Sequence, residues 1–161
     1  MKRLILVRHG KSSWDYDVPD DERPLKERAF NDADTVISAV KDQIKEPFTI
    51  WSSYAKRALT TAKIFQEKLD VPAASFEIRD DLYTFNGNEL LNEIKTCEDQ
   101  VQTLMVFGHN PAMTQVVNHL GDQHFDNIPT TGLTWLEFEV DSWEDIRHGK
   151  TILYLFPKNL S

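Results

Sequence analysis

Two short apolar runs in this chain each lead directly into a histidine, and this pattern limits the fold more than any other feature. Residues 4–7 (Leu-Ile-Leu-Val) precede Arg8 and His9, and residues 104–107 (Leu-Met-Val-Phe) precede a glycine and His109. Short, continuous apolar runs bounded by glycine are typical of buried strands. In an open α/β sheet, residues at the carboxyl ends of separate strands meet over one crevice. We therefore predict that His9 and His109 lie close together at one edge of a sheet.

The rest of the chain alternates strand-like runs with stretches whose apolar residues recur every three to four positions. We expect strands over residues 4–7, 48–51, 75–79, 104–107, 133–140 and 150–156, and helices over 25–40, 53–69, 89–97 and 110–120. This alternation is typical of βαβ units on a largely parallel sheet. The segment between the last two strands is too short for a crossover helix, so we expect that pair to be antiparallel. The predicted fold class is α/β, a three-layer α/β/α sandwich with a mostly parallel sheet and an antiparallel strand near the C-terminus.

Capping residues, prolines and glycines mark the expected helix ends and loops. We expect Ser53 to cap its helix, and Asn110 to cap the helix after His109, with Pro111 at the first helical position and glycine beyond the end. His109 would then lie at a helix N-terminus, where the peptide dipoles favour an anion. Residues 11–24 are polar and contain two prolines, which predicts a surface loop.

Length and composition narrow the classes of function. The 161 residues predict a single domain over residues 1–161. The net charge of −8 argues against nucleic acid and acidic membranes as partners, because both require a basic surface. The single cysteine, Cys97, excludes an internal disulfide, and its helical spacing predicts packing in the core. We expect a cytoplasmic location, since no apolar run approaches membrane-spanning length and no secretory signal is evident. The oligomeric state stays open, and a monomer is compatible with the sequence.

Two arginines accompany the two histidines. Arg8 directly precedes His9, and Arg57 lies near the start of the helix expected after the strand at residues 48–51. A guanidinium group is always charged and binds phosphate oxygens through two parallel N–H groups. The pattern therefore predicts a local basic pocket for a phosphoryl group in an acidic protein. No metal-ligand motif such as H-x-x-x-H occurs, so we expect neither a metal ion nor another cofactor.

Four blocks of sequence, in this order, resemble the histidine phosphatase superfamily of phosphoglycerate-mutase-like enzymes. They are Arg-His-Gly-Lys-Ser-Ser-Trp at 8–14, Arg-Pro-Leu at 23–25, Ser-Tyr-Ala-Lys-Arg-Ala-Leu-Thr-Thr-Ala at 53–62 and Gly-His-Asn-Pro at 108–111. The closer resemblance is to the small SixA-type phosphohistidine phosphatases, and only residues 129–132 of the C-terminal third fit, loosely. Single blocks are common, but the ordered combination is specific.

The resemblance implies a metal-independent enzyme that removes phosphate from a histidine of a partner protein in two steps. It assigns His9 as the nucleophile that accepts the phosphoryl group, and Arg8, Arg57 and His109 as the phosphate pocket. A neutral imidazole can serve as such a nucleophile. The rim of the pocket is expected to include Ser12 and Ser13.

The chain departs from the wider superfamily at the general acid. Mutase-like members carry a glutamate in a pattern like L-x-E, and the equivalent here is Leu-Tyr-Thr at 82–84, without a carboxylate. Asp80, Asp81 and Glu89 are the nearby candidates for this role. An imidazole leaving group has a conjugate acid with a pKa near 6.5 and can depart without a dedicated acid, whereas an alkoxide needs one. The missing acid therefore favours a phosphohistidine substrate.

Two smaller departures and two alternative functions remain. Asp15 replaces an asparagine of the mutases and is expected to point outward, and Ala29 replaces a glycine and is expected to affect helix packing.

The first alternative function is that of a phosphatase or mutase for small phosphomonoesters, which would need a general acid. The second, more remote, is a phosphate-binding adaptor without catalysis, which would not need both histidines.

Overall fold

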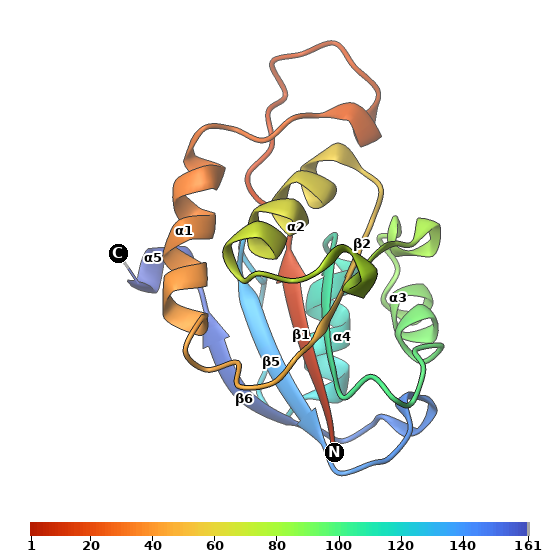
Figure 1. The fold of residues 1–161 in the computed structure, drawn as a ribbon. Helices are drawn as coiled ribbons and strands as arrows, with labels where there is room; N and C mark the ends of the chain where they lie inside the picture. Colours follow the sequence, from red (N-terminus) through yellow and green to blue (C-terminus); the bar gives the residue numbers. More distant parts are fainter. Residues whose placement is uncertain (161) are drawn as a thin grey trace.

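Six strands form one sheet in the computed structural model, which describes residues 1–160 (Figure 1). They are β1 (Lys2–Arg8), β2 (Thr49–Ser52), β3 (Phe76–Ile78), β4 (Thr103–Gly108), β5 (Leu133–Phe138) and β6 (Lys150–Leu155). The order across the sheet is β3-β2-β4-β1-β5-β6. The first four strands in the chain run parallel, β5 is antiparallel to β1, and β6 is antiparallel to β5. The predicted α/β class with an antiparallel strand near the C-terminus is confirmed; Ser161, the last residue of the expected domain, lies outside the described residues.

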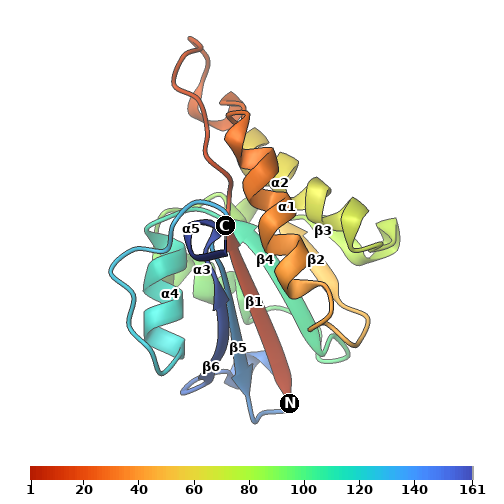
Figure 2. The ribbon, with the colours of Figure 1, turned by 90° about the vertical axis from the view of Figure 1, so that its left-hand side faces the viewer.

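Helices cover both faces of the sheet, as Figure 2 shows. One face carries α1 (Arg28–Val40) and α2 (Lys56–Lys68), and the other carries α3 (Gly87–Ile94) and α4 (Ala112–Leu120), while α5 (Pro157–Leu160) packs near α1. Short 3₁₀ turns lie at Asp20–Glu22, Ala73–Ser75, Asp80–Leu82 and Trp143–Asp145. Among residues 1–160, no helix combines the length and the apolar character needed to cross a membrane.

The central strands are buried on both faces. In β1, Leu4 and Leu6 belong to the apolar cluster under α3 and α4, whereas Ile5 and Val7 belong to the cluster under α1 and α2. Because side chains alternate between the faces of a strand, a strand covered by helices on both sides must be apolar at every position. This explains the continuous apolar runs that predict β1 and β4. Cys97 is buried in the first cluster, which agrees with its predicted place in the core.

Several helix boundaries differ from those expected. α1 begins at Arg28 rather than residue 25, because Leu25 instead forms an isolated antiparallel bridge with Ser12. The N-cap of α2 is Ala55, and the expected cap Ser53 is a buried residue of the preceding segment. Strand pairing and tertiary packing therefore override the local capping signals at both helices.

The other two corrections concern α3 and α4. α3 begins at Gly87, and Asn86 caps it by accepting a hydrogen bond from the backbone N–H of Glu89 at 3.1 Å. In α4 the N-cap is Pro111, one residue later than expected. The side chain of Asn110 nevertheless accepts a hydrogen bond from the backbone N–H of Thr114 at 3.1 Å, so it satisfies a donor of the first turn.

The loop after β1 forms an arm, defined here as residues 12–25. Its two ends pair with each other, since the backbone N–H of Ser13 donates to the carbonyl of Pro24 at 2.8 Å. Figures 1 and 2 show the arm rising beyond the end of β1, on the side where the parallel strands end. The predicted surface loop is thus a paired excursion that lies beside the strand ends.

Phe65 tests the packing that joins α2 to β4. Its ring is fully buried and meets the ring of Phe107 at a centroid distance of 5.0 Å. Phe65→Ala should lower the free energy of unfolding by about 3–5 kcal/mol, because a large cavity replaces the ring. Phe30→Ala, at a ring that is 46% exposed on α1, is the matched control and should cost less than about 1 kcal/mol. Urea unfolding of both variants measures the difference, and equal losses would contradict this account of the core.

Candidate active site

The register of β1 against β4 brings the two histidines together. Arg8 lies directly opposite Gly108 in the parallel pair, and the backbone N–H of His9 donates to the carbonyl of Gly108 at 3.1 Å. His9 and His109 therefore leave the sheet side by side, with ring centroids 5.3 Å apart. This is the proximity that the two strand ends predict.

A third strand end adds a side chain that holds His109. The backbone N–H of Ser53, just after β2, donates to the carbonyl of Phe107 at 3.1 Å. Its hydroxyl oxygen lies 2.8 Å from Nε2 of His109, and both residues are almost fully buried. Ser53 thus orients the imidazole of His109, a role that its position in the sequence did not indicate.

The loop after β1 is tied to the helix that carries Arg57. The backbone N–H of Gly10 donates to Oγ1 of Thr61 at 3.0 Å, and that hydroxyl donates to the carbonyl of Arg57 at 2.8 Å. A Cβ at position 10 would lie 2.9 Å from the Cβ of Ala29, so glycine permits this close approach. The methyl group of Ala29 thus lies on the side of Gly10 where a side chain at position 10 would point.

Thr131 ties down the end of β1 from the other side. Its backbone N–H lies 3.0 Å from the carbonyl oxygen of Arg8 and 3.1 Å from that of His9. Thr131 has a φ of 60°, a left-handed conformation that is unfavourable by about 1–2 kcal/mol for a residue with a side chain. The fold sustains this strain at the backbone that positions His9.

The hydrogen bonding of His9 determines its tautomer. Nδ1 lies 2.7 Å from the carbonyl oxygen of Gly10, and a carbonyl only accepts, so Nδ1 carries the proton. Burial lowers the pKa of His9 to about 3, with the positive charges of Arg57 and Arg8 acting in the same direction. At neutral pH the imidazole is therefore uncharged, and the lone pair of Nε2 is available as a nucleophile.

His109 is neutral for a similar reason. Its pKa is lowered to about 3, mainly by burial, and the positive charge of Arg57 acts in the same direction. The rings of Tyr83 and Phe85 lie 5.2 Å and 5.6 Å from it, and its Nδ1 has no hydrogen-bond partner within residues 1–160. A phosphoryl group beside this ring would favour the protonated form, because an adjacent opposite charge raises the pKa of a histidine.

The two arginines form the basic part of the site. Arg57 is only 2% exposed, and NH1 of Arg8 donates to the carbonyl of Ile128 at 2.8 Å. The Nε atoms of both arginines are buried without a partner among the described residues. Each of these buried N–H groups therefore lacks an acceptor, and an anion that reached them would supply one.

Asp20, which the sequence did not single out, lies on Arg57. NH1 of Arg57 donates to the backbone carbonyl of Asp20 at 2.6 Å, and NH2 donates to its Oδ2 at 2.9 Å. The hydroxyl of Tyr83 donates to the same carboxylate oxygen, and Nε of Arg23 lies 3.3 Å from Oδ1. Burial opposes the charge of Asp20, but hydrogen bonds from Tyr83 and Arg57 outweigh it and lower its pKa to about 2.

Arg23 connects the arm to this cluster. Its NH1 donates to Oγ of Ser12 at 2.7 Å, and its guanidinium lies 3.7 Å from the ring centre of Trp14. Of the two rim candidates, Ser12 is thus linked to the basic cluster through Arg23. Ser13 is also buried, but its hydroxyl accepts a hydrogen bond from the backbone of Asp15, within the arm. Asp15 is exposed, as expected.

The three candidate general acids lie in a neighbouring hollow. Asp80, Asp81 and Glu89 are exposed and line a cavity of about 410 Å³ together with Tyr83 and Thr84. Oγ1 of Thr84, at the position of the mutase acid, donates to Glu89 at 2.5 Å. Within residues 1–160, none of these three carboxylates bonds to the histidines or arginines of the site, and no three His, Cys, Asp or Glu residues gather as a metal site would require.

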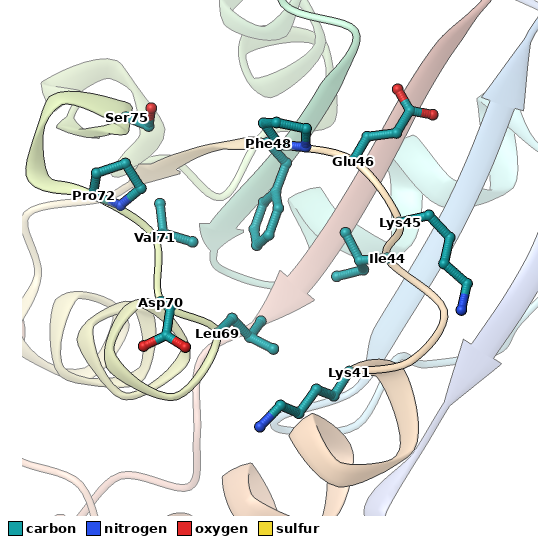
Figure 3. A pocket seen from close by; sticks show the side chains of 11 residues that line it. Lys41, Ile44, Lys45, Glu46, Phe48, Leu69, Asp70, Val71, Pro72 and Ser75 are labelled. Atoms are coloured by element: carbon teal, nitrogen blue, oxygen red, sulfur yellow. The ribbon is translucent and has the colours of Figure 1, made fainter.

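Another hollow lies away from the histidines (Figure 3). It measures about 520 Å³ and lies between the C-terminal ends of α1 and α2 and the segment that leads into β2. Its lining includes Ile44, Phe48, Leu69 and Val71, with Lys41 at its edge. Because the hollow adjoins the start of β2, it is at the opposite end of the strand from Ser53 and the histidines.

Comparisons with known proteins identify the family to which the chain belongs. The sequence model of the histidine phosphatase superfamily (branch 1) matches residues 4–90, more than half of the chain, and this chain belongs to that family. It is 29% identical to an uncharacterized chloroplastic protein of Arabidopsis thaliana, over 89% of this chain and 70% of that protein.

Two solved structures share the fold. The protein histidine phosphatase SixA complexed with tungstate superposes with a TM-score of 0.83 and 20% identity, covering 99% of both chains. A mycobacterial glucosyl-3-phosphoglycerate phosphatase superposes with a TM-score of 0.68 and 15% identity, covering 95% of this chain and 98% of that one. Membership of the histidine phosphatase superfamily supports a phosphatase, and the solved structures show that the fold is shared.

The depressed histidine pKa values predict an acid-sensitive fold. Unfolded histidine has a pKa near 6.5, whereas His9 and His109 have values of about 3 in the folded protein. The unfolded state therefore binds more protons below pH 6.5, and stability present above that pH is lost as the pH falls toward 3. Each histidine should contribute a slope on the order of 1 kcal/mol per pH unit.

Urea unfolding between pH 7 and pH 4.5 measures this slope. His109→Asn should flatten it, and His124→Asn, at an exposed histidine, is the matched control and should retain the wild-type slope. Parallel curves for wild type and His109→Asn would contradict the assignment of a buried, neutral His109.

Proposed function

We propose that this protein hydrolyses phosphohistidine on a partner protein through a covalent intermediate at His9. The observation that carries the proposal is the contact between Nδ1 of His9 and the carbonyl of Gly10, which leaves Nε2 as the unprotonated nitrogen, with the ring 5.3 Å from that of His109. Arg8 and Arg57 supply fixed positive charge in the same cluster. This combination suits a nucleophile that attacks phosphorus within a pocket for phosphate oxygens.

In the first step Nε2 of His9 attacks the phosphorus of the substrate. A new N–P bond forms, and the N–P bond to the substrate imidazole breaks. The leaving imidazole keeps the electron pair and takes up a proton from the solvent. Charge on the equatorial oxygens is stabilised by Arg8, Arg57 and a His109 that gains a proton beside the anion.

In the second step a water molecule attacks the phosphorus of phospho-His9. The N–P bond breaks, and Nε2 recovers its lone pair. Inorganic phosphate departs with the oxygen of the water, which restores neutral His9. No side chain other than those of the pocket is needed for either step, since imidazole is the leaving group in both.

Two features around the site support a protein substrate. Aromatic side chains near the strand ends are exposed, including Trp14 at 75%, Tyr16 at 61%, Phe85 at 48% and Tyr54 at 39%. Exposed aromatic residues around a polar centre are typical of protein interfaces. The structural neighbour named as a protein histidine phosphatase adds support, because the fold matches over nearly its whole length.

A small phosphomonoester is the second candidate substrate. The cavity lined by Asp80, Asp81 and Glu89 is the specific observation in its favour, since a carboxylic acid there could protonate an alkoxide. The glucosyl-3-phosphoglycerate phosphatase among the structural neighbours shows that the fold also serves a small substrate.

A trapping experiment tests the covalent step. Wild type that turns over a ³²P-labelled substrate should carry label on His9 after an alkaline quench, because phosphohistidine survives alkali but not acid. His9→Ala should carry none, and His119→Ala, at an exposed histidine of α4, should retain the label. Absence of label from wild type during turnover, or label of equal intensity in His9→Ala, would refute the intermediate.

The dependence of rate on the leaving group tests the substrate class. Without a strong general acid, phosphohistidine and aryl phosphates should react far faster than alkyl phosphates in the phosphorylation step. Asp80→Asn, Asp81→Asn and Glu89→Gln should each reduce alkyl-phosphate turnover by less than the roughly 100-fold typical of a lost general acid. A single variant that loses about 100-fold in alkyl-phosphate turnover and keeps its aryl-phosphate turnover would identify the general acid. It would favour a small phosphomonoester as the substrate. Pre-steady-state measurements separate this step from hydrolysis of phospho-His9.

A further inference from the structure

Asp20 occupies one edge of the Arg57 guanidinium through two of its oxygens, the backbone carbonyl on NH1 and the carboxylate on NH2. Both terminal nitrogens of Arg57 are engaged by Asp20, at 2.6 Å and 2.9 Å. Arginine binds phosphate in the same manner, through two N–H groups to two oxygens. Arg57 is 2% exposed whereas the side chain of Asp20 is 43% exposed, so the carboxylate reaches the solvent and the guanidinium that it contacts does not.

Other contacts hold Asp20 in this position. The hydroxyl of Tyr83 donates to the carboxylate oxygen that Arg57 contacts, and Arg23 lies against the other oxygen. The ring of Tyr83 is also 5.2 Å from that of His109. Asp20 therefore links the arm to Tyr83 across the cluster that contains both candidate catalytic histidines. His9 is 7% exposed and His109 is 1% exposed in this arrangement.

While Asp20 is in place, a phosphoryl group cannot form the paired contact with the edge of the guanidinium that NH1 and NH2 share. We propose that Asp20 is an internal competitor of the substrate: its carboxylate neutralises Arg57 in the free enzyme and must move away when a phosphoryl group binds. This inference rests on the proposed function only in taking Arg57 as part of the phosphate pocket. Binding of a substrate must supply the free energy that displaces Asp20 from Arg57. Asp20 thus determines specificity, because substrates differ in how much of this free energy they supply.

The arm relates this displacement to the size of the substrate. Arg23 contacts Asp20 and also stacks on the exposed ring of Trp14. Asp20 and Trp14 are therefore connected through one side chain of the arm. A protein that contacts Trp14 gains binding energy from the segment that carries Asp20. A small phosphate ester makes no contact with Trp14. Its own binding free energy must therefore displace Asp20 from Arg57, which lowers its apparent affinity.

Titration calorimetry of the full chain with inorganic tungstate tests the competition without requiring catalysis. Asp20→Asn keeps the shape of the side chain and removes its charge, and it should bind tungstate about tenfold more tightly than wild type, a change of about 1.4 kcal/mol. Tyr83→Phe removes one hydrogen bond to the carboxylate and should shift the affinity less, in the same direction. Asp21→Asn is the matched control, since it removes the same charge from the same turn without a contact to Arg57 among the described residues, and it should stay within about twofold of wild type.

Each other outcome of the titration is decisive. Equal or weaker binding by Asp20→Asn would overturn the proposal, since Asp20 would then support the position of Arg57. An equal gain in Asp21→Asn would also overturn it, because general electrostatics would explain the change. If wild type and all variants fail to bind tungstate, the phosphate pocket itself is refuted, together with the proposed function.

Steady-state kinetics with p-nitrophenyl phosphate and an alkyl phosphate distinguish competition from proton donation. A competitor predicts that Asp20→Asn lowers KM by about the factor seen in the titration and leaves kcat unchanged for both substrates. A general acid predicts a loss of kcat, on the order of 100-fold for the alkyl phosphate and small for the aryl phosphate. The second pattern would overturn the proposal and assign Asp20 as the missing acid.

Discussion

The parallel register of β1 against β4 is the constraint on which the site depends. Pairing Arg8 with Gly108 brings the following histidines side by side, and the order β2-β4-β1 places Ser53 next to His109 in the same row. A slip of one residue would move every side chain of a strand to the opposite face of the sheet. The backbone of Thr131, which has a φ of 60°, bonds to the carbonyls of Arg8 and His9 on the other side of β1.

Electrostatics explains how an acidic protein maintains a basic pocket. The chain carries a net charge of −8, yet Arg57 is buried next to two neutral imidazoles. An unpaired buried cation is costly, so a counter-charge is needed close by. Asp20 supplies it in the free protein, and a bound phosphoryl group would supply it during turnover. The positive charges of Arg57 and Arg8 also lower the pKa of His9. They help to keep its imidazole neutral, which is the form that a nucleophile requires.

The arm joins the surface of the molecule to this chemistry. Trp14 contacts Arg23, Arg23 contacts Asp20, and Asp20 contacts Arg57. These contacts form a continuous path from an exposed aromatic ring to a buried guanidinium. A loop that sequence analysis treats as a polar surface segment is therefore part of the candidate site. In our proposal it is the element through which the size of a substrate affects binding of its phosphoryl group.

Local patterns in the sequence determined the fold class, the two strand ends that carry His9 and His109, and the helix that carries Arg57, because apolar periodicity reports which residues face a core. The helix starts at Arg28, Lys56, Gly87 and Ala112 were less well predicted, since strand pairing and packing compete with capping signals. Only the tertiary structure showed that Ser53 contacts His109, and that Asp20 forms hydrogen bonds with Arg57 and Tyr83. These last contacts join residues separated by 37 and 63 positions, and their geometry follows from how the arm packs over the strand ends, which no local pattern of residue types encodes.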